Sequence, residues 1–526
     1  MARRLNSRRR RLSLETLGVS PRGRLRRALP AVRRRDVLAA ALLVVALVVV
    51  LNHRDLATIA AGSGDLGTAR RLGGSLAVVG FLAALGLVYL VRFERQLLGA
   101  GRRLVVFGTC CLGCVGAAEA LMAADAQVVE AWRGLVLLTP VAAFAIFFAV
   151  VYGQRAAISG TIMLSLLVGL AAGVGPSATV RPLALTLVLV SGGLVAALAS
   201  RTIRGRLKLL NVGLLVGLMQ AALFLGLELW EGRAALERLS LSAPLWCLAN
   251  GVGVGVVMTL LLPFIEVLFN VATEMRLLEL SDQERPLLRA LVARAPSTDN
   301  HSRRVALLAE AAAEAIGANS LLTLVASYYH DIGKITKPEF FIENQVGPVS
   351  PHDRLRPSMS ALIIASHTRD GVELAREAKL PKAIIDIIAQ HHGTSVIEFF
   401  YNRYLQEAGD KPALDESFFR YPGPKPRSKE AAIVLLADAV EAASRTLSEP
   451  VPSRIETLVR RITTAKLLDG QLEESGLTLS ELHRIEQALF RVLCSMYHAR
   501  IEYPTTTASR RRTVGARAAA ALSVDT

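Results

Sequence analysis

The hydrophobic positions of this chain follow one pattern in its first half and another in its second. Between Val37 and Leu262 there are eight apolar runs, most of them near the roughly 20 residues that a membrane-spanning helix needs. The runs lie at about residues 37–51, 75–91, 104–124, 134–152, 156–175, 182–199, 207–227 and 243–262. The first two are short, so seven and eight spans are both consistent with the pattern. We therefore predict a polytopic bundle of transmembrane helices over residues 37–262.

After the last run, apolar residues recur at three- and four-residue spacing, which is typical of amphipathic helices. The run 302–316 stops at Gly317, a residue type that often ends a helix, and Ser428 is suited to cap a later one. We expect an amphipathic connector over residues 263–297 and an all-helical domain over residues 298–503. The predicted fold class is therefore all-α throughout.

Composition and charge support a membrane location. The mean hydropathy of +0.41 is too apolar for a soluble enzyme. Residues 1–35 contain 13 arginines and a single acid, Glu15, which is typical of a cytoplasmic topology signal that contacts anionic lipid. We expect residues 1–36 to form a disordered arm on the cytoplasmic face of the cell membrane, the lipid bilayer to be a partner, and no DNA or RNA to bind. The tail over 504–526 is also expected to be disordered.

The charges of the loops favour the same orientation. Arginines such as Arg102 and Arg204 fall in predicted inside loops, and acids such as Glu231 fall in predicted outside loops. Arg70 and Arg71 are an exception. Because eight spans return the chain to the side on which it started, both the N-terminus and the second half of the chain are predicted to be cytoplasmic.

The second half also holds a set of side chains that suits metal ions. Imidazole and carboxylate are the ligands that borderline divalent metals prefer, and seven of them can supply two adjacent sites. Asp331 is the predicted bridge between the sites, because it follows His330 directly yet projects about 100° around the helix from it. Two metal ions can hydrolyse a phosphodiester without a side-chain nucleophile. The seven residues are His301, His330, Asp331, His367, His391, His392 and Asp438.

Three further residues are candidates for contact with a substrate. Lys334 follows a tight turn after the His330-Asp331 pair, so we assign it with Asp331 to catalysis and expect it to offset phosphate charge; an ordinary solvated lysine is the alternative. Arg445 and Tyr329 are candidate phosphate or base contacts. Asp438, Glu441 and Arg445 share one helix face, and an intrahelical ion pair is the other interpretation of that face.

Over roughly residues 75–500 the chain resembles the seven-transmembrane HD phosphohydrolase family of the PgpH type. The resemblance is most specific in Arg276-Leu-Leu-Glu-Leu-Ser-Asp, His301-Ser302, Ala311-Ala-Ala-Glu-Ala-Ile-Gly-Ala-Asn, Tyr328-Tyr-His-Asp-Ile-Gly-Lys, Phe341-Ile-Glu-Asn-Gln, Ser360-Ala-Leu-Ile-Ile-Ala-Ser-His, Gln390-His-His-Gly-Thr-Ser and Tyr421-Pro-Gly-Pro-Lys-Pro.

The resemblance implies a membrane-anchored enzyme that opens cyclic di-AMP to pApA with two iron or manganese ions. It further implies that one ion is held by His301, His330, Asp331 and Asp438, and the other by Asp331, His367, His391 and His392. Oligomerisation of the chain with itself is left open.

The chain departs from the family in one large respect, because members usually carry a sizeable extracytoplasmic domain where this chain has only a loop at about residues 52–74. Two alternatives remain: an HD phosphohydrolase for another nucleotide, cyclic di-GMP or guanosine tetraphosphate, and a catalytically silent membrane receptor. Cyclic di-GMP enzymes carry Gly-Tyr-Pro soon after their histidine pair. Here Tyr421-Pro422 follows His392 by about 30 residues, which counts against them.

Overall fold

The computed structural model describes residues 34–63, 65–93, 101–125, 138–173, 182–200, 203, 205–230, 242–345, 347, 349–409 and 414–498. The predictions for the N-terminal arm up to residue 33, for most loops between the apolar helices and for the C-terminal tail lie outside these residues. Two compact units are present, Met1–Phe269 and Asn270–Thr526. Within the described residues no strand forms beyond one isolated bridge between Val396 and Arg420, so the all-α prediction is confirmed.

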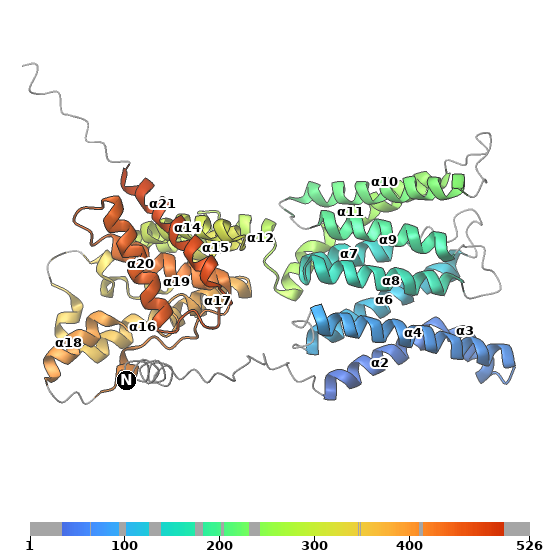
Figure 1. The fold of residues 1–526 in the computed structure, drawn as a ribbon, viewed down its shortest axis with the longest axis horizontal. Helices are drawn as coiled ribbons and strands as arrows, with labels where there is room; N and C mark the ends of the chain where they lie inside the picture. Colours follow the sequence, from blue (N-terminus) through green and yellow to red (C-terminus); the bar gives the residue numbers. More distant parts are fainter. Residues whose placement is uncertain are drawn as a thin grey trace, which may run out of the picture. The chain divides into compact units, whose positions relative to one another are not determined.

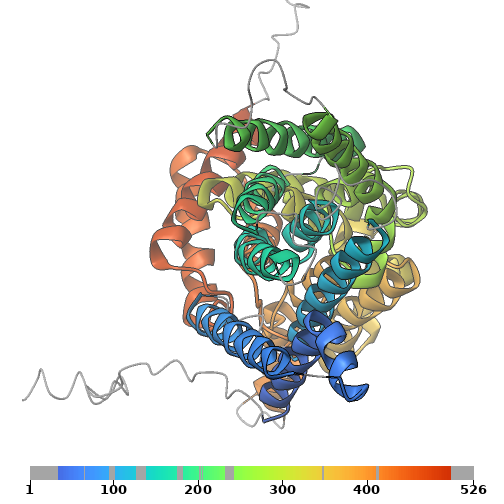
Figure 2. The same ribbon diagram turned by 90° about the vertical axis from the view of Figure 1, so that its right-hand side faces the viewer.

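The first unit is a bundle of apolar helices, drawn in Figure 1 and viewed from one end in Figure 2. Each of the eight apolar runs forms a helix, and the short α3 follows the first of them. Three helical segments are long and apolar enough to cross a membrane, Leu66–Gly86, Arg206–Trp230 and Ala243–Phe269, and the other apolar helices are shorter. The helices are α2 (Arg34–Leu51), α3 (His53–Ala60), α4 (Leu66–Phe93), α6 (Gly101–Asp125), α7 (Leu138–Val151), α8 (Gln154–Gly173), α9 (Pro182–Ala199), α10 (Arg206–Trp230) and α11 (Ser242–Phe269).

Helices α10 and α11 approach so closely that their backbones touch. A Cβ atom built on Gly217 would lie 2.8 Å from the carbonyl oxygen of Cys247, and one built on Gly255 would lie 2.9 Å from that of Leu209. Small residues at such contacts are typical of helix packing in membranes, because association there relies on close van der Waals contact. Helix α11 also continues past the expected end of the last span, with Pro263 inside it.

The second unit consists of α-helices joined by short 3-10 helices. Its α-helices are α12 (Glu274–Leu280), α13 (Pro286–Arg294), α14 (Pro296–Ile316), α15 (Ser320–Tyr329), α16 (Pro357–Glu377), α17 (Lys382–Gln390), α18 (Glu398–Ala408), α19 (Lys429–Ser444), α20 (Pro452–Leu468) and α21 (Leu479–His498). Its 3-10 helices are η4 (Ile332–Thr336), η5 (Pro338–Phe340), η6 (Ile342–Asn344), η7 (Pro351–Arg354) and η8 (Glu416–Phe419).

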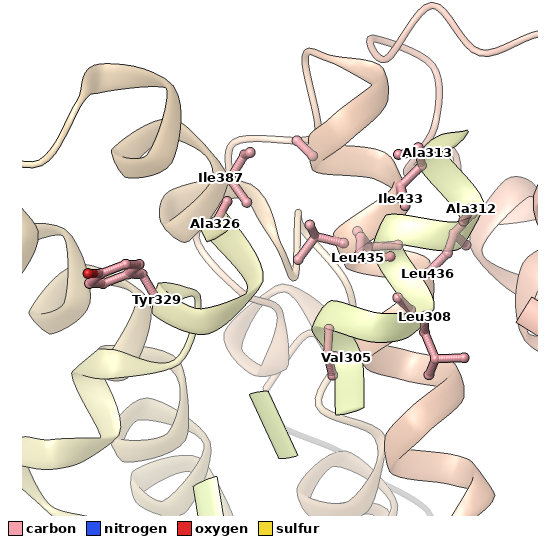
Figure 3. Close-up of a cluster of buried hydrophobic side chains, with 14 of the residues drawn as sticks. Val305, Leu308, Ala312, Ala313, Ala326, Tyr329, Ile387, Ile433, Leu435 and Leu436 are labelled. Carbon is pink, nitrogen blue, oxygen red and sulfur yellow. The ribbon is translucent and has the colours of Figure 1, made fainter. Parts of the chain in front are cut away.

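Two helix ends follow directly from the sequence. Gly317 ends α14 with a left-handed φ of 71°, a conformation that costs glycine little, and the Ser428 hydroxyl accepts a hydrogen bond from the Ala431 amide at the start of α19. The residues 431–437 of α19 are all buried. Figure 3 shows several of them against apolar side chains of α14. Helix α19 is therefore the centre of this unit, and it carries Asp438 into the interior.

Candidate metal centre

The seven predicted metal-binding side chains converge from five helices. His301 lies in α14, His367 in α16 and Asp438 in α19. The other four lie at helix ends: His330 and Asp331 follow α15, and His391 and His392 follow α17. Six of the seven residues are buried, and the side chain of His392 is 21% exposed.

Their ligand atoms form two groups that meet at Asp331. One group contains Asp331, His367, His391 and His392, and the other contains His301, His330 and Asp438, with the atoms of each group within 4.8 Å of one another. Asp331 Oδ1 lies 3.4 Å from His367 Nε2 and 3.7 Å from His391 Nε2. Asp331 Oδ2 lies 3.3 Å from His330 Nε2 and 3.6 Å from His301 Nε2. One carboxylate therefore presents one oxygen to each group.

Three of the histidines are oriented by the backbone of their own helix. The Nδ1 atoms of His330, His367 and His391 lie 2.7, 2.6 and 2.7 Å from the carbonyl oxygens three residues earlier. A carbonyl oxygen only accepts hydrogen bonds, so each Nδ1 carries the proton. The lone pair of each neutral ring is then on Nε2, which faces the centre and is available to a metal ion.

The donor set contains buried atoms that a divalent cation would satisfy. His330 Nε2 and Asp331 Oδ1 are buried without a hydrogen bond of acceptable geometry, and the cation nearest to Asp331 Oδ2 is the amine of Lys334, 2.9 Å away. His367 Nε2 and His391 Nε2 lie 3.2 Å apart, and in the neutral rings neither carries a hydrogen. Buried polar atoms left unpaired are costly, and two facing lone pairs repel each other. These residues therefore fit divalent metal ions of the kind that nitrogen and oxygen ligands bind.

Burial and neighbouring charges shift the pKa values of the side chains in the centre in different directions. Burial lowers the pKa of His391 to about 3, with further lowering by His330 and His367 nearby, and burial is also the main cause that lowers the pKa of His392. Burial alone would raise the pKa of Asp331, but Lys334 and His330 hold it well below its usual range. The centre thus contains an ionised carboxylate beside the neutral imidazoles of His391 and His392, which are the forms that bind metal. Burial would also lower the pKa of His330, but Asp331 and Asp438 raise it to about 10, so a metal ion there must displace a proton.

The amine of Lys334 is held between two carboxylates and is largely shielded from solvent. Its Nζ lies 2.9 Å from Asp331 Oδ2 and 2.8 Å from Glu343 Oε1, and its side chain is 12% exposed. Burial would lower the pKa of Lys334, but the two carboxylates raise it, so the amine stays charged. The alternative of an ordinary surface lysine is therefore wrong. No role was assigned to Glu343 from the sequence, although the residue lies in the family-like string Phe341-Ile-Glu-Asn-Gln.

Two candidate substrate contacts lie elsewhere. The Tyr329 hydroxyl donates to the Leu280 carbonyl oxygen at 2.8 Å, and the residue is 1% exposed. Arg445 Nε donates to Glu441 Oε1 at 2.9 Å, one turn earlier in the chain. Both polar groups therefore have protein partners, and the contacts of Tyr329 and Arg445 with a substrate stay predictions. The intrahelical ion pair is the interpretation of Arg445 that the structure supports.

Three residues beside the centre were not found from the sequence. The Tyr421 ring stacks on His392, with centroids 4.2 Å apart and an angle of 26° between the planes. Lys466 Nζ donates to Ser395 Oγ at 2.7 Å. Glu441 Oε2 accepts a hydrogen bond from His301 Nδ1 at 2.5 Å. Two of them were partly indicated by the sequence: Tyr421 begins one of the strings that resemble the family, and Glu441 shares a helix face with Asp438. No sequence pattern indicated Lys466.

Comparison with known proteins defines the class. Residues 70–273 match the family described as 7TM receptor with intracellular HD hydrolase, and residues 298–443 match the HD domain family. The chain belongs to this family of seven-transmembrane HD proteins. It is therefore a membrane protein, and the seven helices from α4 to α11 fall within or overlap the matched membrane region. Divalent metal binding is general to HD domains, in agreement with the donor set described above.

Particular relatives are named Cyclic-di-AMP phosphodiesterase PgpH. The protein from Bacillus subtilis is 43% identical over 371 residues, which are 70% of this chain and 52% of that protein. The protein from Listeria monocytogenes is 39% identical over 320 residues, 61% of this chain and 44% of that protein. The chain spans about half the length of these curated relatives. A crystal structure of the L. monocytogenes PgpH HD domain is 45% identical and covers 41% of this chain and 100% of its own, with a TM-score of 0.39.

Proposed function

We propose that this chain is a membrane-anchored phosphodiesterase that hydrolyses cyclic di-AMP to the linear dinucleotide pApA. The observation that carries the proposal is the buried donor set in which Asp331 presents one oxygen to each of two ligand groups. The two relatives of that name, 43% and 39% identical, support the choice of substrate. The catalytic domain and the N-terminus are proposed to be cytoplasmic.

Two divalent ions, iron or manganese, are the proposed cofactors. His301, His330, Asp331 and Asp438 would hold one, and Asp331, His367, His391 and His392 would hold the other. Bound there, such ions supply Lewis acidity toward phosphoryl oxygens and make a water molecule acidic enough to be a nucleophile at neutral pH. The chain's own part is to hold the neutral imidazoles in place and to exclude bulk water around Asp331.

Lys334 is proposed to act on the charge of the substrate. Its amine stays protonated beside Asp331 and supplies a fixed positive charge next to the ligand groups. A fixed charge in a partly buried site costs no reorganisation when negative charge develops on a phosphate. Lys334 is therefore the side chain that we expect to stabilise the transition state in addition to the metal ions.

The full chain, purified in detergent and loaded with iron or manganese, tests the activity. Cyclic di-AMP should be converted to pApA in preference to cyclic di-GMP, and Asp331→Asn should abolish the conversion. Asp386→Asn is the matched control, since Asp386 is an exposed acid of α17 that pairs with Lys382. Preferential cleavage of cyclic di-GMP would overturn the substrate assignment. Binding of metal without cleavage of either dinucleotide would favour a silent receptor.

Orientation needs a separate test. Fusions of green fluorescent protein and of alkaline phosphatase after residue 526 should be fluorescent and inactive, respectively, if the catalytic domain is cytoplasmic. The opposite pair of results would place the domain outside and remove its access to an intracellular dinucleotide.

A further inference from the structure

His301 is oriented differently from the three histidines whose Nδ1 atoms contact the carbonyl oxygen three residues earlier in the chain. Its Nδ1 lies 2.5 Å from Oε2 of Glu441, a residue of α19 that is 1% exposed. Its Nε2 faces the centre, 2.9 Å from Asp438 Oδ1 and 3.6 Å from Asp331 Oδ2. A charged acceptor from a second helix therefore replaces the neutral carbonyl that the other rings use.

Glu441 is held in place by its second oxygen. Oε1 accepts a hydrogen bond from Arg445 Nε at 2.9 Å and lies 3.6 Å from a terminal nitrogen of Arg304. Hydrogen bonds from His301 and Arg445 keep the pKa of Glu441 low although burial would raise it. Each oxygen of the carboxylate thus has its own donor, and neither is free to turn.

We propose that Glu441 is a positioning residue, which fixes His301 with its proton on Nδ1 and strengthens the Nε2 lone pair as a metal ligand. A carboxylate behind a metal-binding imidazole sets the tautomer and raises its basicity. The inference rests on the proposed metal centre but not on the proposed substrate. Glu441 bonds to His301, one of the two histidines in the group of His301, His330 and Asp438. It therefore distinguishes the two sites, because that group has an anion behind one histidine and the other has three histidines around Asp331.

The replacement Glu441→Gln is diagnostic because an amide has only one acceptor oxygen. Both Arg445 and the protonated Nδ1 of His301 need an acceptor at this position. If the amide oxygen turns to Arg445, the amide NH₂ faces His301 and drives its proton to Nε2, where it blocks the metal. Removing the competing donor with Arg445→Leu should let the amide oxygen return to His301.

The experiment measures metal ions per chain by mass spectrometry across a manganese titration of the full purified protein. Wild type and the matched control Glu430→Gln should hold two ions; Glu430 lies on the same helix, accepts from the Asn319 amide and contacts no histidine. Glu441→Gln should hold one ion where wild type holds two, with the affinity of the second site reduced by about 10–100-fold. Glu441→Gln with Arg445→Leu should recover much of that affinity.

Two ions at wild-type affinity in Glu441→Gln would overturn the proposal. If that variant does not fold, Glu441→Asp is measured instead, since it keeps the charge but is one methylene too short to reach His301; unchanged binding of both ions there would also overturn it. Failure of wild type to bind two ions would count against the proposed cofactors themselves. Binding of two ions without hydrolysis would count against the substrate and leave the role of Glu441 standing.

Discussion

The Nε2 atoms of His367 and His391 face each other at 3.2 Å, although each ring already directs its Nδ1 to a backbone carbonyl. Neither nitrogen has a hydrogen to give to the other in the neutral rings, so the pair is unfavourable without a cation. Removal of metal with a chelator should therefore destabilise the second unit. An ion present at 100 times its dissociation constant stabilises by about 2.7 kcal/mol, which calorimetry can detect. Identical melting with and without chelator would contradict this.

Lys334→Met should make stability depend more strongly on metal. The change leaves the buried Asp331 and the partly buried Glu343 without their shared cation. Breaking a buried pair in this way costs about 3–5 kcal/mol, and divalent ions should offset much of that cost. The melting temperature of the variant should thus fall sharply in chelator and little in manganese, and turnover should be reduced in both iron and manganese forms. Lys382→Met, at an exposed ion pair, is the control. Equal destabilisation with and without metal would argue against this account.

Gly333→Ala should disrupt the centre by displacing α16. A Cβ atom at this position would overlap the carbonyl of His367 and lie 2.6 Å from the Gly371 amide nitrogen. Since both neighbours are backbone atoms, the strain is relieved only by moving His367 away from Asp331. We expect loss of one metal ion and of most activity, measured as bound metal and initial rate. Gly226→Ala, where nothing lies within 4 Å of the new atom, should behave as wild type.

Lys466→Met should weaken substrate binding more than turnover. Its amine donates to Ser395, three residues after His392, and among the described residues no carboxylate lies within ion-pair distance of it. Burial lowers the pKa of Lys466, which favours a phosphate partner that would restore the charged form. A hydrogen bond to a charged group contributes about 1.5–3 kcal/mol, so KM should rise by about tenfold or more with kcat little changed. A fall in kcat alone would instead place Lys466 in the chemical step.

Glu481→Gln should reduce stability near neutral pH and have little effect in acid. Glu481 accepts hydrogen bonds from Lys429 and from the Thr478 amide, which lower its pKa to about 2, below the value of about 4.3 in an unfolded chain. A carboxyl group whose pKa is depressed by folding stabilises the protein above its unfolded pKa, and this contribution is lost as the pH falls through the folded pKa. The melting temperatures of wild type and variant should therefore converge between pH 5 and 2. A constant difference would mean that the charge is not responsible.

The sequence predicted which side chains converge in the second unit, but not what surrounds them. Histidines and aspartates next to glycine turns can be recognised from the sequence alone, and so can helical periodicity. Glu441 and Glu343 are ordinary acids in the sequence, and their roles depend on which helices pack together. Tyr329 was predicted as a substrate contact at the site, yet its hydroxyl donates to the Leu280 carbonyl oxygen. Arg445 was assigned there because it follows Asp438 by two turns, and the nearer Glu441 takes its guanidinium.

The contact between α10 and α11 limits how the membrane helices can move. Where Gly217 and Gly255 meet the facing backbone, neither glycine has a Cβ atom to separate the two helices. Such close backbone contact favours movement of α10 and α11 together over movement of one helix past the other.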